Sequence, residues 1–371
     1  MIKTGVIGTR GFPEIQGGLE THCMELYTRL ARLDDNLITV YRRKPYISAK
    51  NRDITYPNIR FLDLNVPKSK NFETFFHSLL ATVHALFQKY DIVHFHNTGP
   101  GFFIPLLKFS GAKIVFTYHN ISYTQKKWGS FARHYLELSE RICLKNADYV
   151  IFISEVLKSE MTKKYSIAKW KIISNGVNMN PRSENTDYIE SLGLEKNKYI
   201  IGVGRFLEEK GFDYLIRAFV KAELQGYKLV IVGDTDYPTD YSNRLRAFAR
   251  DKGIVLTGFI KGDNLRQVYS FARLFVIPSF SEGHPIALLE AMSYNIEVLA
   301  SDIPANLQIK LEKDDYFRVG DEDDLKDKIV AKLSGKGRKD YIGFLTERYS
   351  WDKIAEETNN IYNKLKFSNE T

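Results

Sequence analysis

Two residues in the C-terminal half have the charge and spacing that a diphosphate ligand requires. Arg205 follows Gly204 at the end of an expected strand, and Lys210 lies five residues later, before an expected helix at 212–221. A guanidinium and an ammonium beside a helix N-terminus form a strong site for a diphosphate. Exposed surface cations without a specific purpose are the alternative interpretation of this pair.

The segment 278–292 contains two glutamates, Glu282 on an expected loop and Glu290 on the helix that follows it. Pro285 suits the first turn of that helix, and the backbone N–H groups of the loop can hold an anion between them. One carboxylate could accept the hydroxyls of a sugar, and the other the diol of a ribose. The alternative is that Glu282 and Glu290 are ordinary surface residues, which is the usual interpretation of two glutamates that flank a helix but is not favoured in this loop.

A glycine-rich loop at 8–20 joins the first expected strand to the first expected helix. Its glycines, among them Gly17 and Gly18, allow backbone N–H groups to approach a ligand at the positive end of the helix. The spacing differs from GxGxxG, and residues 41–43 (Tyr-Arg-Arg) stand where a ribose-binding acid is expected, so a nicotinamide dinucleotide is not favoured. Glycines that serve only the turn remain the alternative.

Three histidines, His94, His96 and His119, lie at the ends of expected strands. A histidine at a strand end is usually a satisfied hydrogen-bonding residue, and we favour this interpretation for His94 and His96. A zinc site needs three or four convergent ligands, and the sequence offers no cysteine or HExxH partner. We therefore expect no metal site.

Short β-branched and aromatic segments alternate with helical patterns, which predicts parallel sheets covered by helices. The expected strands are 4–8, 37–41, 59–64, 92–96, 113–119, 149–154, 171–174, 199–204, 228–233, 254–259, 274–278 and 297–301. Two such arrays predict an α/β fold of two doubly wound, Rossmann-like domains facing across a cleft, with ligands beyond the carboxyl ends of the strands. The expected domains are 1–180 and 195–348, with their boundary in the polar segment 178–198. In the C-terminal segment 349–371 we expect a helix at 351–365 that crosses back to the first domain.

The combined pattern resembles the retaining family 4 glycosyltransferases of GT-B fold, over essentially the whole chain. The resemblance rests on Glu282-x7-Glu290, Arg205-x4-Lys210, His119, Gly17-Gly18 and Asn175-Gly176-Val177. It implies that Arg205 and Lys210 bind the donor diphosphate, that Glu282 contacts the donor sugar, and that Glu290 binds the ribose. It also implies that His119 lies near the sugar and the acceptor. The implied catalytic residues are His119, Glu282, Arg205 and Lys210. The implied donor site comprises Gly17, Gly18, Gly204, Arg205, Lys210, Glu282, Gly283, His284, Pro285, Ile286 and Glu290.

The opening loop is similar to that of a bacterial subgroup linked to rhamnosyl transfer in capsule and O-antigen assembly. The matching segments are 8–13 (Gly-Thr-Arg-Gly-Phe-Pro) and 17–21 (Gly-Gly-Leu-Glu-Thr), while His284 stands where the family more often has an aromatic or aliphatic residue. The resemblance implies a nucleotide-sugar donor (UDP, dTDP or GDP), a glycan or polyprenyl-diphosphate-linked acceptor and retention of configuration. Residues 234–236 (Asp-Thr-Asp) look like a metal-binding DxD, but they lie where this family has an ordinary loop. We expect no metal and no other cofactor.

Two other functions remain open. A sugar-nucleotide epimerase would share the architecture, although the spacing of Glu282 and Glu290 argues against it. A non-catalytic sugar-nucleotide-binding protein would not need every anion-binding residue. Nucleic-acid binding is not expected, because no RRM, KH or helix-turn-helix pattern accompanies the basic residues.

Composition and charge restrict the cellular context. Of 371 residues, 44% are apolar and 26% charged, which excludes disorder, collagen and coiled coil. Neither a signal peptide nor a span of about 18 apolar residues is found, and the two separated cysteines predict reduced thiols in a cytosolic protein.

Residues 1–180 hold 25 Lys and Arg against 14 Asp and Glu, a balance of +11, whereas residues 181–371 have a balance of −3. The basic residues of the first half include Arg42, Arg43, Lys44, Lys68, Lys70, Lys126, Lys127, Lys163 and Lys164. With an aromatic helix face at Phe72, Phe75, Phe76 and Leu79, this excess predicts peripheral contact with the anionic cytoplasmic face of the cell membrane. A helix face that only covers the sheet is the alternative.

Overall fold

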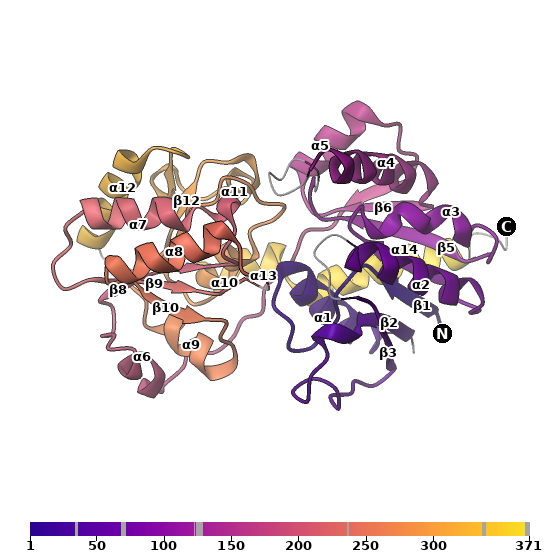
Figure 1. Cartoon of the computed structure of the whole chain (residues 1–371), viewed down its shortest axis with the longest axis horizontal. Coiled ribbons are helices and arrows are strands. Elements are labelled where there is room, and N and C mark those ends of the chain that lie inside the picture. The colour runs from indigo at the N-terminus through magenta and orange to yellow at the C-terminus, as the bar shows by residue number, and fades with distance from the viewer. Residues whose placement is uncertain are drawn as a thin grey trace. The chain divides into compact units, whose positions relative to one another are not determined.

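The computed structural model describes residues 1–33, 36–67, 72–121, 123, 129–235, 237–335 and 339–367. The chain divides into two compact units (Figure 1). The first contains Met1–Asn175 and Trp351–Thr371, and the second contains Gly176–Ser350. Each unit is described by itself below.

The first unit is built on a seven-stranded, wholly parallel sheet in the order β3-β2-β1-β4-β5-β6-β7. Its strands are β1 (Lys3–Ile7), β2 (Leu37–Arg43), β3 (Ile59–Leu64), β4 (Ile92–His96), β5 (Lys113–Tyr118), β6 (Tyr149–Phe152) and β7 (Trp170–Ile172). The central strand β4 is buried along its whole length. Such burial requires helices on both faces of the sheet.

Two layers of helices supply that cover. Helices α1 (Gly18–Leu30) and α14 (Trp351–Phe367) pack together on one face, and α14 is the yellow helix beside the indigo α1 in Figure 1. The other face is covered by α2 (Glu73–Leu86), α3 (Ile104–Leu107), α4 (Ser130–Asn146) and α5 (Glu155–Lys164). The 3₁₀ turns η1 (Lys44–Tyr46) and η2 (Pro100–Phe103) complete the unit. The C-terminal helix is thus part of the first unit's core.

The second unit repeats the design with a six-stranded parallel sheet in the order β10-β9-β8-β11-β12-β13. Its strands are β8 (Tyr199–Val203), β9 (Lys228–Val232), β10 (Val255–Gly258), β11 (Leu274–Ile277), β12 (Glu297–Ser301) and β13 (Tyr316–Phe317). One face is covered by α7 (Phe212–Lys221), α8 (Asp240–Asp251) and α12 (Glu322–Ser334). The other is covered by α6 (Asp187–Ser191), α9 (Gly262–Ser270), α10 (Ile286–Ser293) and α13 (Ile342–Arg348). Short turns at η4 (Glu208–Lys210), α11 (Pro304–Leu307) and η5 (Lys313–Asp315) connect these elements.

The predicted fold of two Rossmann-like α/β units is confirmed, and each predicted strand end lies within two residues of the observed one. The boundary between the two compact units lies just before the polar segment 178–198 in which it was predicted. The chain passes between the units at Asn175 and Gly176, and the N–H of Val177 donates to the Tyr349 carbonyl oxygen at 2.9 Å within the second unit. The polar segment then forms α6, whose Ile189 is buried in the second unit's core.

The strand orders locate the positions where ligands bind. In each sheet the order reverses beside the first strand of the unit, between β1 and β4 and between β8 and β11. Ligands of open parallel sheets bind beyond the carboxyl ends of the strands at such a switch point. The chemistry-bearing loops of this chain follow these strands.

Candidate functional site

The switch point of the second unit brings two predicted site residues into direct contact. Lys210 ends η4, after β8, and Glu282 lies in the loop after β11. The Nζ of Lys210 lies 2.6 Å from Oε1 of Glu282, and the Ser279 hydroxyl donates to the same oxygen at 2.7 Å. The Glu282 side chain is 10% exposed. An anionic ligand that reached Lys210 would compete with this carboxylate for the ammonium.

The backbone between β8 and α7 explains why these residues meet. Gly211 has a left-handed φ of 65°, and a Cβ at this position would lie 2.5 Å from the carbonyl oxygen of Pro278. The N–H of Phe280 donates to the carbonyl oxygen of Glu209 at 2.8 Å, which joins the loop after β11 to η4. Only glycine fits this close approach without strain.

The remaining donor-site predictions of this unit lie around the same strand ends. Gly204 and Arg205 directly follow β8, and a Cβ on Gly204 would lie 3.3 Å from the ring of Phe212, the first residue of α7. Arg205 is half-buried. A cation held at the end of β8 and a second cation on η4 give this switch point two positive charges.

The segment 283–286 leads from the loop into α10. The structure places Pro285 at the N-cap, one position before the predicted first turn, and Ile286 begins the helix. Both Leu288 and Leu289 donate their N–H groups to the Pro285 carbonyl oxygen, at 3.0 and 3.3 Å. His284 is buried, with its ring 5.8 Å from that of Tyr349, and Gly283 is half-buried before it.

Glu290 lies in α10 and contacts α9. The hydroxyl of Tyr269 donates to Oε2 of Glu290 at 3.1 Å, and the Tyr269 ring stacks on Tyr294 with ring centroids 5.2 Å apart. Burial, followed by the charge of Glu290, raises the pKa of Tyr269 well above its usual value, so the phenol keeps its proton and remains a donor. This contact fixes the carboxylate that is predicted to bind a ribose.

Asp234 of the DxD-like segment pairs with Arg246 of α8. Its Oδ1 also accepts from the N–H of Thr235 at 2.8 Å. Asp236 lies outside the described residues. In the described part of this segment, Asp234 therefore forms an ion pair that joins the loop to α8.

In the first unit, the predicted glycine pair opens α1. Gly17 is the N-cap and Gly18 the first helical residue. Arg10 and Glu20 pair across the loop at 3.1 Å, and a Cβ on Gly17 would lie 2.1 Å from Oε2 of Glu20. Gly17 thus allows the Glu20 carboxylate to reach Arg10, which is a structural role for the glycine in the turn.

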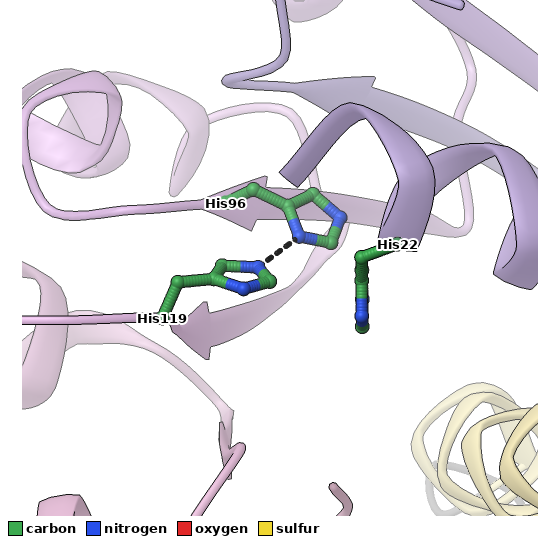
Figure 2. Close-up of side chains that lie close together, drawn as sticks. All are labelled: His22, His96 and His119. Atoms are coloured by element: carbon green, nitrogen blue, oxygen red, sulfur yellow. Dashed lines mark hydrogen bonds between the residues drawn. The ribbon is translucent and has the colours of Figure 1, made fainter. Parts of the chain in front are cut away.

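His119, predicted near the sugar and acceptor, belongs to a buried cluster with His22 and His96. Figure 2 shows the three side chains converging from α1, from the end of β4 and from the residue after β5. One ligand nitrogen from each ring lies within 4.8 Å of the others. The Nδ1 of His96 lies 2.9 Å from Nε2 of His119, the interaction dashed in Figure 2.

Further polar side chains orient these rings. The Nδ1 of His22 lies 2.7 Å from Oδ1 of Asn175, and the hydroxyl of Tyr27 lies 2.5 Å from Nε2 of His96. The same hydroxyl lies 2.9 Å from Nδ1 of His94, whose Nε2 lies 2.7 Å from the Thr117 hydroxyl. His94 is therefore a satisfied core histidine, as the sequence predicted.

Burial sets the charge of the cluster. Desolvation lowers the pKa of His22 to about 4, although its contact with Asn175 acts in the opposite direction. Burial, followed by repulsion from the other histidines, holds the pKa values of His96 and His119 well below the usual range. The three rings are accordingly neutral near pH 7.

The sequence did not predict this convergence, because it considered only the histidines at strand ends. His22 lies on a helix and reaches the strand ends only through the packing of α1 on the sheet. The signal that could have identified it is its position, four residues after the helix begins at Gly18, where ligands of this fold bind. The sequence analysis considered only cysteine and HExxH as partners for the strand-end histidines, and the structure adds His22 as a third convergent imidazole.

Comparison with known proteins agrees with this architecture. The Glycosyltransferase Family 4 domain matches residues 16–180, and the domain described as glycosyl transferases group 1 matches residues 184–339. An uncharacterized glycosyltransferase of Methanocaldococcus jannaschii is 30% identical over 94% of this chain and 95% of its own length. O-antigen chain mannosyltransferase B of Escherichia coli is 24% identical over 72% of this chain and 74% of its own length.

The fold has solved counterparts. Sucrose-phosphate synthase from Thermosynechococcus elongatus superimposes with a TM-score of 0.80 at 22% identity, covering 98% of this chain and 99% of that chain. At this identity the likeness concerns the fold, which is GT-B. The two domain matches and the full-length relative show that this chain belongs to the glycosyltransferases, with a family 4 domain followed by a group 1 domain.

Proposed function

We propose that this glycosyltransferase moves a sugar from a nucleoside-diphosphate donor to a glycan or lipid-linked acceptor, with retention of configuration, in bacterial surface polysaccharide synthesis. The observation that carries the proposal is the contact of Lys210 with Glu282 at the switch point of the second unit, beside Arg205. A relative of this chain is an O-antigen chain mannosyltransferase, which supports the choice of pathway. The loop sequence at 8–21 makes rhamnose the first sugar to test.

The proposed chemistry assigns each residue a separate role. Arg205 and Lys210 neutralise the charge that develops on the leaving diphosphate, and Glu282 holds hydroxyls of the transferred sugar. The departing phosphate oxygen takes the proton of the acceptor hydroxyl, which attacks from the same face. Glu290 binds the ribose of the donor, and neutral His119 of the first unit hydrogen-bonds sugar or acceptor. With two cations assigned to the diphosphate, the proposal includes no metal.

The test is donor binding followed by analysis of the product. A thermal-shift series with UDP, dTDP and GDP identifies the base, because a ligand at 100 times its Kd stabilises by about 2.7 kcal/mol. The matching sugar nucleotides, dTDP-rhamnose among them, are then incubated with a polyprenyl-diphosphate-linked sugar, and NMR gives the anomeric configuration of the product. An inverted anomeric centre would contradict retention, and sugar-nucleotide conversion without transfer would indicate an epimerase.

We further propose that the first unit lies on an anionic membrane surface. No helix among the described residues has the length and hydropathy of a membrane span. Helices α2, α3 and α4 form a continuous layer, and their outer surface exposes large apolar side chains. We call this set the apolar face: Phe72, Phe76, Leu80, Val83, Phe87, Leu106, Phe109, Phe131 and Leu138.

The apolar face has the spacing of a surface-bound helix. On α2 and its two caps, exposed residues recur at 72, 76, 80, 83 and 87, and Phe87 is 78% exposed. The exposed cations Lys108, Arg133, Arg141 and Lys145 lie on α4 or directly after α3. Within α2, α3 and α4, all of whose residues are described, Glu137 is the one exposed carboxylate. An apolar stripe flanked by cations suits an anionic bilayer.

Several residues predicted to form the membrane surface have other roles. Arg42 is buried in an ion pair with Asp63 at 2.7 Å, and Arg43 is buried in one with Glu73 at 2.8 Å. Phe75 packs inward, with its ring 5.2 Å from that of Phe103, and Leu79 is half-buried, so neither belongs to the exposed stripe.

The other predicted cations divide into two groups. Lys68, Lys70, Lys126 and Lys127 lie outside the described residues. Lys163 and Lys164 are exposed at the end of α5, where Lys164 donates to the Tyr123 hydroxyl at 2.9 Å.

A further inference from the structure

We propose that His22, His96 and His119 form a binding site for a divalent transition metal of the zinc class. The three imidazoles come from three separate elements, and one nitrogen of each lies within 4.8 Å of the other two. All three side chains are buried, so their arrangement is fixed by the core of the first unit. The site lies in the first unit, whereas the cations assigned to the diphosphate lie in the second.

The contacts of His22 leave Nε2 as the nitrogen available to a metal. The Asn175 amide oxygen can only accept, so Nδ1 of His22, 2.7 Å away, carries the hydrogen. The lone pair then lies on Nε2, which is buried and has no hydrogen-bond partner within the described part of the chain. A buried acceptor without a partner is costly, and a metal ion would satisfy it.

The other two rings are also presented as ligands. Tyr27 contacts Nε2 of His96, which directs Nδ1 of that ring toward Nε2 of His119. Hydrogen bonds from the far side of a ligand ring are the usual way in which proteins orient metal-binding histidines. Asn175 orients His22 in this way, and Tyr27 orients His96.

Metal binding would draw the most widely separated nitrogens of the cluster closer together. Nitrogens bound to a tetrahedral metal at about 2.0–2.1 Å lie about 3.3 Å apart. His96 and His119 are slightly closer than this, at 2.9 Å, and the widest separation in the cluster is 4.8 Å. The hydrogen now shared by His96 and His119 would move to the other nitrogen of the ring that carries it, which leaves both facing nitrogens as ligands.

The donor set selects the metal. Imidazole nitrogens suit Zn²⁺, Cu²⁺, Ni²⁺ and Co²⁺, whereas Mg²⁺ and Ca²⁺ need oxygen ligands. Three histidines leave a fourth position of a tetrahedral ion open to water or another ligand. The site therefore differs in chemistry from the magnesium sites that bind diphosphates.

Occupation of this site would regulate the enzyme, a consequence that rests on the proposed function. A metal bound to Nε2 of His119 would fix the hydrogen on Nδ1 and add positive charge beside it, so the ring could no longer accept a hydrogen bond from sugar or acceptor. Zn²⁺ is then an inhibitor of an enzyme that works without metal. Chelators would leave turnover of the metal-free enzyme unchanged and would reverse the inhibition.

The test is cobalt titration of the full-length chain, purified without a histidine tag and stripped with a chelator. One equivalent of Co²⁺ is expected to produce the strong visible absorption of a four-coordinate site, and Zn²⁺ is expected to abolish it. His22→Gln should weaken Co²⁺ binding at least tenfold, while His134→Gln, at an exposed histidine of α4, should bind as the wild type does. Tyr27→Phe keeps the ring and the core packing, and should weaken binding about 10–100-fold through His96.

The outcomes separate the two proposals. Absence of the absorption, or equal affinity in the wild type and His22→Gln, would overturn the metal site whatever the enzyme transfers. Cobalt binding without glycosyl transfer would leave the site in place and contradict the proposed function. If both hold, Zn²⁺ should inhibit the wild type at least tenfold more strongly than Tyr27→Phe.

Discussion

The ammonium of Lys210 lies 2.6 Å from the carboxylate of Glu282, so a donor that binds at the proposed site would meet an existing ion pair. A diphosphate would bind the ammonium in place of the carboxylate, and this would free Glu282 to accept hydroxyls of the sugar. In the proposed mechanism, the pair would therefore couple diphosphate binding to the positioning of the sugar.

Lys210→Ala should lower kcat/KM by about 10²–10³-fold, by analogy with the removal of one donor to a developing oxyanion, which costs about 2.7–4 kcal/mol. Affinity for the nucleoside diphosphate should fall far more than affinity for the nucleoside. Isothermal titration with both ligands measures the difference. Lys221→Ala, at the exposed end of α7, is the control and should retain wild-type affinity. Equal losses for nucleoside and nucleoside diphosphate would contradict the assignment of Lys210.

Substitutions of Glu282 and Glu290 should change different steady-state parameters. Glu290→Ala removes a carboxylate fixed by Tyr269, so it should raise the KM for the donor with a smaller change in kcat. Glu282→Gln keeps the size of the side chain but not its charge, and should chiefly lower kcat because sugar contacts strengthen in the transition state. Wild-type kinetics in both variants would mean that the motif has been assigned a wrong role.

Local sequence was sufficient to predict the strands. It assigned Lys210 and Glu282 to one donor site but did not predict the ion pair between them. It was not sufficient for contacts that depend on register or on helix packing. Arg42 was predicted to belong to the basic cluster that meets the membrane, yet β2 and β3 pair it directly with Asp63, which neutralises it. Nothing in the residues around Arg42 identifies that partner.

His22 was missed for a similar reason. Its distance from His96 and His119 depends on how α1 lies on the sheet, which sequence periodicity does not determine. The two-residue strand β13 was also missed, because Tyr316 and Phe317 are too few to form a recognisable pattern.

Gly211→Ala should disrupt the donor site through the backbone alone. The new Cβ would lie 2.5 Å from the Pro278 carbonyl oxygen, which would push η4 away from the loop that carries Glu282. Gly226→Ala is a matched control, because Gly226 also has a positive φ (74°) but has no atom within 4 Å of the added Cβ. We expect Gly211→Ala to be less stable than the control by about 1–3 kcal/mol and to bind the donor more weakly. Calorimetry and donor titration measure the two effects, and identical behaviour of both variants would contradict the argument.

His77 predicts how the stability of the first unit depends on pH. It is buried on α2, and desolvation, followed by the charge of Arg43, holds its pKa well below the usual range. The unfolded chain takes up a proton near pH 6.5 and the folded chain does not, so stability is complete above pH 6.5 and falls as the pH decreases below it. Between pH 7.5 and 5.5 this single group should cost about 1.4 kcal/mol.

The measurement is urea unfolding followed by tryptophan fluorescence at the two pH values. Trp128, Trp170 and Trp351 are the three tryptophans of the chain, and all belong to the first unit, so the signal reports that unit. In His77→Gln the loss of stability between pH 7.5 and 5.5 should be smaller by about 1.4 kcal/mol than in the wild type. The same pH dependence in both proteins would show that His77 is protonated in the folded state.

The apolar face predicts which substitutions release the protein from a membrane. A triple variant with Phe76, Leu80 and Phe87 changed to serine should lose most of its binding to phosphatidylglycerol vesicles in sedimentation assays. The control changes three exposed apolar residues of the second unit, Val220, Leu307 and Val330, to serine and should sediment as the wild type does.

Charge at the same face should act separately from apolar contact. Changing Lys108, Arg133 and Lys145 to serine should weaken binding to anionic vesicles by about 1 kcal/mol for each cation near the surface. Added salt should also weaken vesicle binding of the wild type. Arg42 and Arg43 are unsuitable for this test, because their loss would break buried ion pairs. If the wild type does not bind anionic vesicles at low salt, the apolar face covers something other than a bilayer and the acceptor need not be lipid-linked.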